Sequence, residues 1–169
     1  MHQYFGNKLT TNIFGSMNKS YNLFLTLFSL LLMNFSCNKE VITPNNYSKN
    51  MIILGSGGGF TGAVSQYYLL ENGLVFRSGN TDTTFTEIGK LEKDVANQLF
   101  ESYLTLNLDK QQLDEPGNRY YFMIHKAKGQ EHKLQWGYKE LTNKTPEIFH
   151  KNFMSLVKKL EISTVNSSK

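Results

Sequence analysis

The sequence predicts one α+β domain in the order β-β-β-α-β-β-α, with two helices packed on a largely antiparallel sheet. Strand-like runs come in pairs around the tight turns Asn72-Gly73 and Lys128-Gly129, which favours hairpins and therefore antiparallel neighbours. In two other segments, residues 90–104 and the stretch after Thr145, apolar residues recur at helical spacing. Together these patterns fit within residues 51–163, so we expect a single domain there.

The sequence of the first half of this domain predicts strands. Residues 51–54 form a short apolar run that ends in glycines, as a buried strand does. Residues 63–70 and 74–77 flank the Asn-Gly pair and predict a hairpin. Residues 81–86 are rich in threonine and predict another strand or a sheet edge. Residues 107–118 are polar and end in a turn.

A second hairpin is predicted in enough detail to give its register. With Lys128 and Gly129 as the turn, residues 119–126 pair with residues 130–138. This register pairs Lys126 with Glu131, His125 with His132, Met123 with Leu134, and Tyr121 with Trp136. Opposite charges then meet at one position and an apolar row forms on one face, so two independent patterns agree.

The two helices follow from apolar periodicity and from end signals. The first helix presents an apolar face that consists of Leu91, Val95, Leu99, Phe100 and Tyr103. The second has Thr145 as its predicted N-cap, Pro146 in its first turn and Glu147 beside the positive helix end. Its predicted buried stripe is Ile148, Phe149, Phe153, Leu156, Val157 and Leu160. We expect residues 164–169 to be a flexible tail.

The N-terminal region indicates export. Residues 23–33 have the length and apolar character of a signal-peptide core, and they follow a short basic segment that begins at Met17. The only cysteine, Cys37, comes soon after this core and resembles the acylated cysteine of bacterial lipoproteins of the Bacteroidota type. This resemblance implies that residues 1–36 are a signal peptide, with Met17 as an alternative start. It also implies that Cys37 is lipidated (palmitate) and that residues 37–50 are a tether.

The resemblance implies an extracytoplasmic protein anchored in the cell envelope, at the outer membrane, with the lipid bilayer as a partner of Cys37. A conventional secretory signal with an incidental cysteine, or an uncut membrane anchor, are the alternatives. Residues 1–36 include Lys8 and Lys19 but no acidic residue, so their removal lowers the net charge from +4 to about +2. Such a small charge argues against a nucleic-acid partner.

Residues 57–62 satisfy the dinucleotide pattern G-x-G-x-x-G after a strand. A dinucleotide site also needs a helix directly after the glycines, and here a strand-like segment reaches a hairpin turn instead. We therefore expect no nucleotide and no other cofactor. Structurally, the glycines suit a loop or bulge with positive φ; functionally, Phe60 would be presented as an apolar anchor for a partner.

A further resemblance rests on the same segment. The strand that leads into Gly58-Gly59-Phe60-Thr61-Gly62, with the later order of helix, strand pair and closing helix, is similar to the emfourin family. Emfourins are small protein inhibitors of thermolysin-like metallopeptidases. The resemblance implies that Gly58, Gly59, Phe60 and Gly62 form a contact loop, and that the partner is a secreted or envelope protein such as a metallopeptidase.

The sequence offers little for catalysis. It contains no H-E-x-x-H or G-x-S-x-G motif, and an acylated Cys37 supplies no nucleophile. His125 and His132 are cross-strand neighbours that suggest a zinc site, but a third ligand is not evident. We therefore expect a non-catalytic, membrane-tethered, protein-binding module rather than an enzyme. A small metal- or ligand-binding enzyme that uses these histidines, and a purely structural envelope lipoprotein, are the alternatives.

Overall fold

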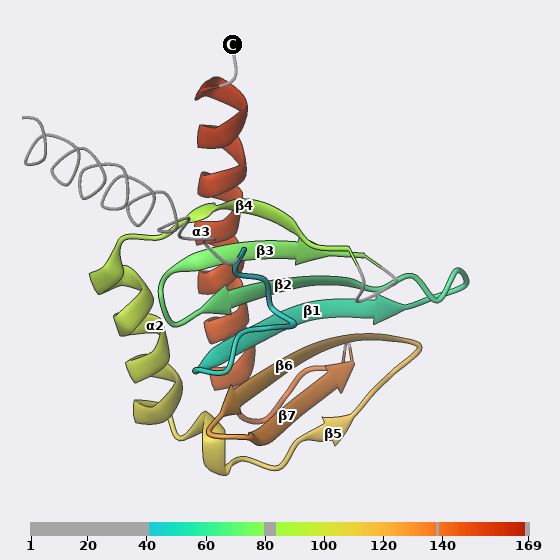
Figure 1. Ribbon diagram of the computed structural model, residues 1–169. Helices are drawn as coiled ribbons and strands as arrows, with labels where there is room; N and C mark the ends of the chain where they lie inside the picture. The colour runs from blue at the N-terminus through green and yellow to red at the C-terminus, as the bar shows by residue number, and fades with distance from the viewer. Residues whose placement is uncertain (1–40, 80–83, 138, 168–169) are drawn as a thin grey trace, which may run out of the picture. The chain divides into compact units, whose positions relative to one another are not determined.

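The computed structural model describes residues 41–79, 84–137 and 139–167 of this chain. The elements that it describes all belong to one compact unit, Ile42–Lys169. This unit is a seven-stranded, mostly antiparallel open sheet with two helices, which confirms the predicted α+β class (Figure 1). Cys37 and the predicted signal peptide, residues 1–36, lie outside the described residues.

The sheet has the strand order β4-β3-β2-β1-β6-β7-β5. The strands are β1 (Met51–Gly58), β2 (Ser65–Leu70), β3 (Leu74–Ser78), β4 (Thr86–Lys90), β5 (Asp114–Glu115), β6 (Arg119–Ala127) and β7 (Gln130–Gly137). Neighbouring strands pair antiparallel, except that β5 runs parallel to β7. The central strand β1 therefore pairs on one side with β2 and on the other with β6, far along the sequence.

The main core lies between the sheet and the two helices, α2 (Lys93–Thr105) and α3 (Thr145–Ser167). Figure 1 shows α3 behind the sheet. Strand residues that point to this side alternate with residues on the opposite side, as the pleat requires. The fully buried side chains of this core include Ile52, Leu54, Leu69, Met123, Leu134, Trp136, Tyr103 and Phe153.

The β6–β7 hairpin has the predicted register. All four predicted pairs are present, and Lys126 Nζ lies 3.1 Å from Glu131 Oε2. The turn residues Lys128 and Gly129 have φ values of 50° and 75°, the positive values that a tight hairpin turn of this twist requires. The β2–β3 hairpin also turns at Asn72-Gly73 as predicted, and Gly73 has φ of 89°.

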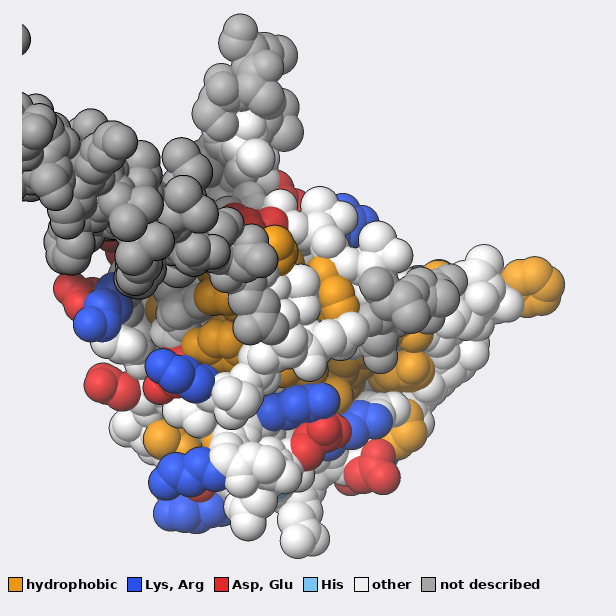
Figure 2. All heavy atoms as spheres, viewed as in Figure 1, with side chains coloured by type: hydrophobic (Ala, Val, Ile, Leu, Met, Phe, Trp, Pro, Cys, Tyr) orange, Lys and Arg blue, Asp and Glu red, His pale blue; other side chains and the backbone are white. Residues whose placement is uncertain are grey.

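A second apolar cluster covers the opposite face of the sheet. Its buried members are Met51, Ile53, Tyr68, Leu70, Phe76 and Phe122. Figure 2 shows hydrophobic side chains across the middle of this face. Among the described residues, no helix packs here. The chain before β1 does so instead, because Tyr47 packs against the cluster and its hydroxyl accepts a hydrogen bond from the Asn72 N–H at 3.2 Å.

The predicted tether, residues 37–50, is therefore too long. Pro44 is buried, and the backbone N–H of Glu71 donates to the carbonyl of Asn50 at 3.0 Å. Residues 43–50 are thus attached to the domain rather than free of it. The polar composition of this segment predicted a linker, but the packing of Tyr47 against the sheet was not visible in its sequence.

Other boundaries also differ from prediction. β1 continues to Gly58, and the fourth strand lies at Thr86–Lys90 rather than at residues 81–86, of which 81–83 lie outside the described residues. The closing helix includes residues 164–167, which were predicted as tail. It continues because Thr164 Oγ1 donates to the carbonyl of Ile88 in β4 at 2.8 Å, which anchors this end of the helix. The helix also begins one residue earlier than predicted, because Thr145, the predicted N-cap, is already helical.

Candidate functional site

The β1–β2 loop carries the residues that the emfourin resemblance identifies. The loop spans residues 59–64 and projects beyond the sheet in Figure 1. Phe60 lies on it with a relative exposure of 107%, the largest for any large hydrophobic residue among the described part of the chain. Figure 2 shows a hydrophobic side chain at the end of this projection.

Backbone contacts with Asn118 hold the base of this loop. The N–H of Gly59 donates to the carbonyl of Asn118 at 2.6 Å. Gly58 has φ of 89°, and a Cβ placed on it would overlap the same carbonyl oxygen. Only glycine combines that backbone conformation with so close an approach. The loop then closes on itself, because the Gly62 N–H donates to the carbonyl of Gly59 at 3.2 Å.

Glycine is required within β1 for a different reason, the close approach of aromatic rings from β6. Gly55 and Gly57 pair across β6 with Phe122 and Tyr120. A Cβ at either glycine would collide with the ring of its partner, so each aromatic ring lies over a glycine on the neighbouring strand. The segment after the loop is a strand, as predicted, and no helix of the described residues has its N-terminus directly after these glycines.

Arg119 adds a cation to the base of the loop. It is exposed, and its side chain lies along Gly59, with Nε 3.4 Å from where a Cβ would be. Together with Tyr120 and the β1–β2 hairpin it lines a shallow cavity of about 300 Å³. The surface around Phe60 therefore combines an apolar tip with a positively charged base. The sequence did not single out Arg119, because its position depends on the pairing of β6 with β1.

The two predicted histidines are cross-strand neighbours, but His132 has no free nitrogen. Its Nε2 lies 2.9 Å from the carbonyl of Gln111, and its Nδ1 lies 2.9 Å from the Tyr103 hydroxyl. A carbonyl only accepts, so Nε2 carries a proton and donates to Gln111, while Nδ1 shares a hydrogen bond with the Tyr103 hydroxyl. His132 is thus fully bonded within the protein and has no lone pair left for zinc.

His125 lies beside the same tyrosine. The centroids of the His125 and Tyr103 rings are 4.7 Å apart. Burial lowers the pKa of His125, the Asp109 carboxylate opposes that shift, and His132 adds to it. Burial and Asp109 both raise the pKa of Tyr103. No group of three or more His, Cys, Asp or Glu suited to a metal ion occurs in the part of the chain that the structure describes.

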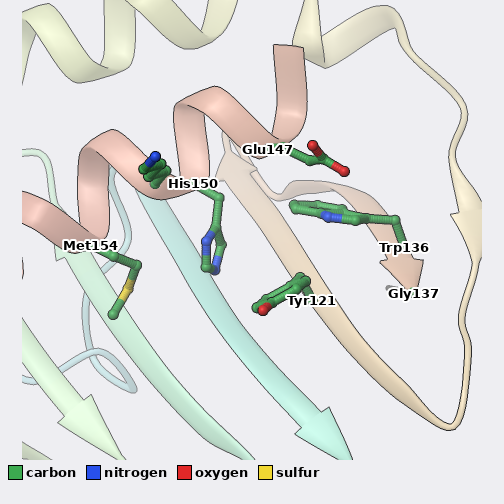
Figure 3. Close-up of a pocket in the computed structure, with 7 residues that line it drawn as sticks. Tyr121, Trp136, Gly137, Glu147, His150 and Met154 are labelled. Carbon is green, nitrogen blue, oxygen red and sulfur yellow. The ribbon is translucent and has the colours of Figure 1, made fainter. Parts of the chain in front are cut away.

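Another cavity, of about 410 Å³, lies between α3 and the ends of β6 and β7 (Figure 3). His150 points from α3 toward the sheet, and its ring lies 5.1 Å from Tyr121 and 5.8 Å from Trp136, centroid to centroid. His150 follows Phe149 of the predicted apolar stripe, but its contact with these two rings was not visible in the sequence. Trp136 is only 1% exposed, so its ring is part of the core and offers no platform to a ligand.

His150 is neutral at physiological pH. Burial lowers its pKa to about 4, and the backbone of Gly55 partly opposes the shift. The Nε2 atom is buried and has no hydrogen-bond partner among the described residues. A buried imidazole without a partner for this nitrogen resists protonation, since the charged form would lose its hydration. The residue therefore makes the packing of α3 sensitive to pH.

Comparisons with known proteins do not extend these observations. No family model matches this chain, and no curated protein matches it. The resemblance to emfourins therefore stays a prediction. No helix among the described residues is long and apolar enough to cross a membrane.

Proposed function

We propose that this chain is a lipid-anchored, extracytoplasmic protein whose domain binds another protein through the β1–β2 loop. The observation that carries the proposal is the complete exposure of Phe60 on a loop whose base is fixed by Asn118. A large aromatic side chain held in water gains about 2–3 kcal/mol when a partner buries it. Isolated exposed side chains are common, so the fixed loop is the second part of the argument.

The fixed base lowers the cost of binding. A flexible loop loses conformational freedom when it binds, and that loss reduces affinity. Here Gly58 and Gly59 are already held by the Asn118 carbonyl, and the turn from Gly59 to Gly62 is closed by a hydrogen bond. Phe60 is thus presented in a partly ordered loop, as interface anchors often are.

The contacts of the histidines support a binding protein over an enzyme. The alternative hypothesis required His132 as a metal ligand, and both of its ring nitrogens are bonded to Tyr103 and Gln111. The buried imidazole of His150, with its pKa near 4, lies against core aromatics rather than beside a nucleophile. We therefore favour a non-catalytic role.

Capture of partners by the full-length chain tests the proposal. Tagged wild-type, Phe60→Ala and Ile148→Ala chains are expressed in the producing cells, and proteins bound from the envelope and secreted fractions are quantified by mass spectrometry. Ile148 was predicted in the buried stripe of α3, but it is 56% exposed, and this exposed large hydrophobic residue is the matched control. We expect proteins that wild type and Ile148→Ala retain to be lost with Phe60→Ala. Identical recovery of proteins with all three chains would exclude the β1–β2 loop as the binding surface.

The finer proposal is that the partner is a secreted or envelope metallopeptidase of the thermolysin type. It rests on the emfourin-like segment from Gly58 to Gly62 alone. We expect the full-length chain to inhibit such a peptidase, and Phe60→Ala to raise the inhibition constant at least about ten-fold, which corresponds to about 1.4 kcal/mol. If the peptidase stays fully active at saturating concentrations of the chain, this target class is wrong.

A further inference from the structure

We propose that the partner bound by the β1–β2 loop presents a carboxylate beside the apolar site that takes Phe60, and that Arg119 pairs with this carboxylate. The inference rests on the proposed function, because it concerns the same surface and adds what chemistry the partner carries. Arg119 lines the shallow cavity of about 300 Å³ at the base of the loop. We call this cavity the Arg119 cavity.

The starting point is a guanidinium group without a counter-ion. Arg119 is exposed and is the first residue of β6, where it pairs with Gly58. Its side chain has no ion pair and no hydrogen bond with any residue that the structure describes. The chain has one other arginine, Arg77, and its guanidinium lies 3.9 Å from Glu161 Oε1. The donors of Arg119 are therefore available to a partner.

Backbone pairing fixes where this cation lies relative to Phe60. The Gly59 N–H donates to the carbonyl of Asn118, the residue before Arg119, at 2.6 Å. The Arg119 side chain then runs along Gly59, with Nε 3.4 Å and Cγ 3.7 Å from where a Cβ would be. Phe60 is the next residue of the loop, and its side chain is fully exposed. The apolar anchor and the cation therefore lie next to each other on one surface, and a partner that buries the first also meets the second.

The remaining lining of the Arg119 cavity fits an anion. Among the described residues that line it, none is Asp or Glu, and apart from Arg119 and Tyr120 they are serines, glycines, Ala63 and Val64. The Tyr120 hydroxyl forms no hydrogen bond with the described residues, so it is a further donor in the same cavity. A cavity with unbonded donors, a positive charge and no negative charge is complementary to an acceptor that carries negative charge.

On a protein partner, that acceptor is the carboxylate of Asp, Glu or the C-terminus. Its two oxygens match the planar guanidinium, which donates two parallel hydrogen bonds to a carboxylate. Burial of Phe60 by the partner excludes water from the neighbouring ion pair and so strengthens it. A partner that buried Phe60 but lacked the carboxylate would leave Arg119 desolvated and unpaired, at a cost in free energy. Arg119 thus determines which apolar sites the loop accepts.

Photocrosslinking with charge variants tests the pair in the full-length chain in producing cells. Benzoylphenylalanine replaces Phe60 in chains that are otherwise wild type or carry Arg119→Ala, Arg119→Glu or Lys133→Glu. Lys133 is the matched control because it is an exposed cation on β7 that does not line the Arg119 cavity. We expect the yield of the position-60 adduct to fall at least about three-fold with Arg119→Ala and about ten-fold with Arg119→Glu, and to stay within about two-fold with Lys133→Glu. Thermal unfolding of the purified chains checks that each is folded.

A zero-length crosslinker identifies the group opposite Arg119. Arg119→Lys keeps the charge and supplies an amine, which a water-soluble carbodiimide joins to a carboxylate in contact with it, with loss of water. The membrane fraction of cells that make this variant is treated with the carbodiimide and analysed by mass spectrometry. We expect an amide bond from the amine at position 119 to an Asp, Glu or C-terminal carboxylate of the same protein that position 60 labels. Wild type, whose guanidinium does not form this amide, is the control.

The outcomes separate this inference from the function on which it rests. A position-60 adduct of unchanged yield in folded Arg119→Glu would overturn the inference and leave the loop as a protein-binding surface. So would a charge-dependent adduct without an amide bond from position 119 to a carboxylate, because Arg119 would then meet a different anion, such as a lipid phosphate. The absence of a position-60 adduct from every folded chain would overturn both the inference and the proposed function.

Discussion

Gly58 shows how a single residue fixes the β1–β2 loop. Its φ of 89° and its contact with the Asn118 carbonyl leave no room for a side chain, so alanine would have to move the loop or the strand beside it. Gly79 has an ordinary backbone conformation and open space where a Cβ would lie. The structure therefore requires glycine at position 58 but not at position 79.

We expect Gly58→Ala to lower the free energy of unfolding by about 1–3 kcal/mol, because strain and overlap act together. Gly79→Ala serves as the control and should change it by less than about 0.5 kcal/mol. Urea denaturation of the two variants measures the difference. Equal midpoints would show that the Asn118 contact does not constrain the loop.

His150 makes stability depend on pH. Its folded pKa, about 4, lies below the usual value of 6.5, so the unfolded chain binds the proton more tightly. Its contribution is complete above about pH 6.5 and is lost as pH falls toward 4. Between pH 7.5 and 5 this amounts to about 2 kcal/mol, and His125, whose pKa is also lowered, acts in the same direction.

His150→Phe keeps a ring against Tyr121 and Trp136 but removes the titrating group. We expect this variant to lose markedly less stability than wild type between pH 7.5 and 5, by about 2 kcal/mol. Urea unfolding of both proteins at the two pH values measures how much stability each one loses. Parallel loss of stability in variant and wild type would contradict a buried, neutral His150.

At the scale of elements, the end of α3 is held by β4. The Thr164 hydroxyl shares its proton between the Ile88 carbonyl of β4, at 2.8 Å, and the Leu160 carbonyl of its own helix, at 3.0 Å. Ser163 Oγ donates only within the helix, to Leu160. We expect Thr164→Val to lower the free energy of unfolding by about 1 kcal/mol and Ser163→Ala to change it by less than half as much. Thermal unfolding of both variants compares them. If Thr164→Val is neutral, residues 164–167 behave as the flexible tail that the sequence predicts.

Elements with a local signal were predictable. The β6–β7 register followed from residues close in sequence, because charge and apolar patterns both pointed to one pairing. The two-residue strand β5 and the shift of the fourth strand were not predictable, since a segment with one inward residue, Ile88, has no periodicity to read. Strands whose position depends on a neighbouring strand could be assigned only from the structure.

The candidate sites divide in the same way. Phe60 and its glycines were visible as a motif, and the structure adds only their exposure and the Asn118 contact. The contacts of Tyr103 with His125 and His132 were not visible, because Tyr103 lies on α2 whereas the histidines lie on β6 and β7. The pairing of His125 with His132 was predicted, but the bonds that occupy His132 depend on Tyr103 and Gln111.

At the scale of the whole molecule, the proposed anchor limits where a partner can be. Pro44 is buried, and residues 38–43 separate it from Cys37. A chain of this length spans at most about 25 Å. If Cys37 is acylated, the domain therefore stays close to the membrane surface, and its partner must reach that surface.

Replacing the thiol tests the anchor. We expect wild type to incorporate an alkyne-tagged palmitate and to fractionate with membranes, and Cys37→Ser to do neither, because Cys37 is the only cysteine in the chain. Ser48→Ala, a change near the start of the domain, should behave as wild type. Wild type without palmitate would favour an ordinary secretory signal with an incidental cysteine.

Site-specific photocrosslinking in living cells tests the central claim, that Phe60 contacts a protein partner. Benzoylphenylalanine replaces Phe60 in one chain and Ile148, which is also exposed, in another. Irradiation followed by blotting and mass spectrometry then reports what lies against each position. The account predicts a discrete protein adduct from position 60 and none from position 148. The same adducts from both positions, or none from position 60 in cells that make a folded chain, would contradict it.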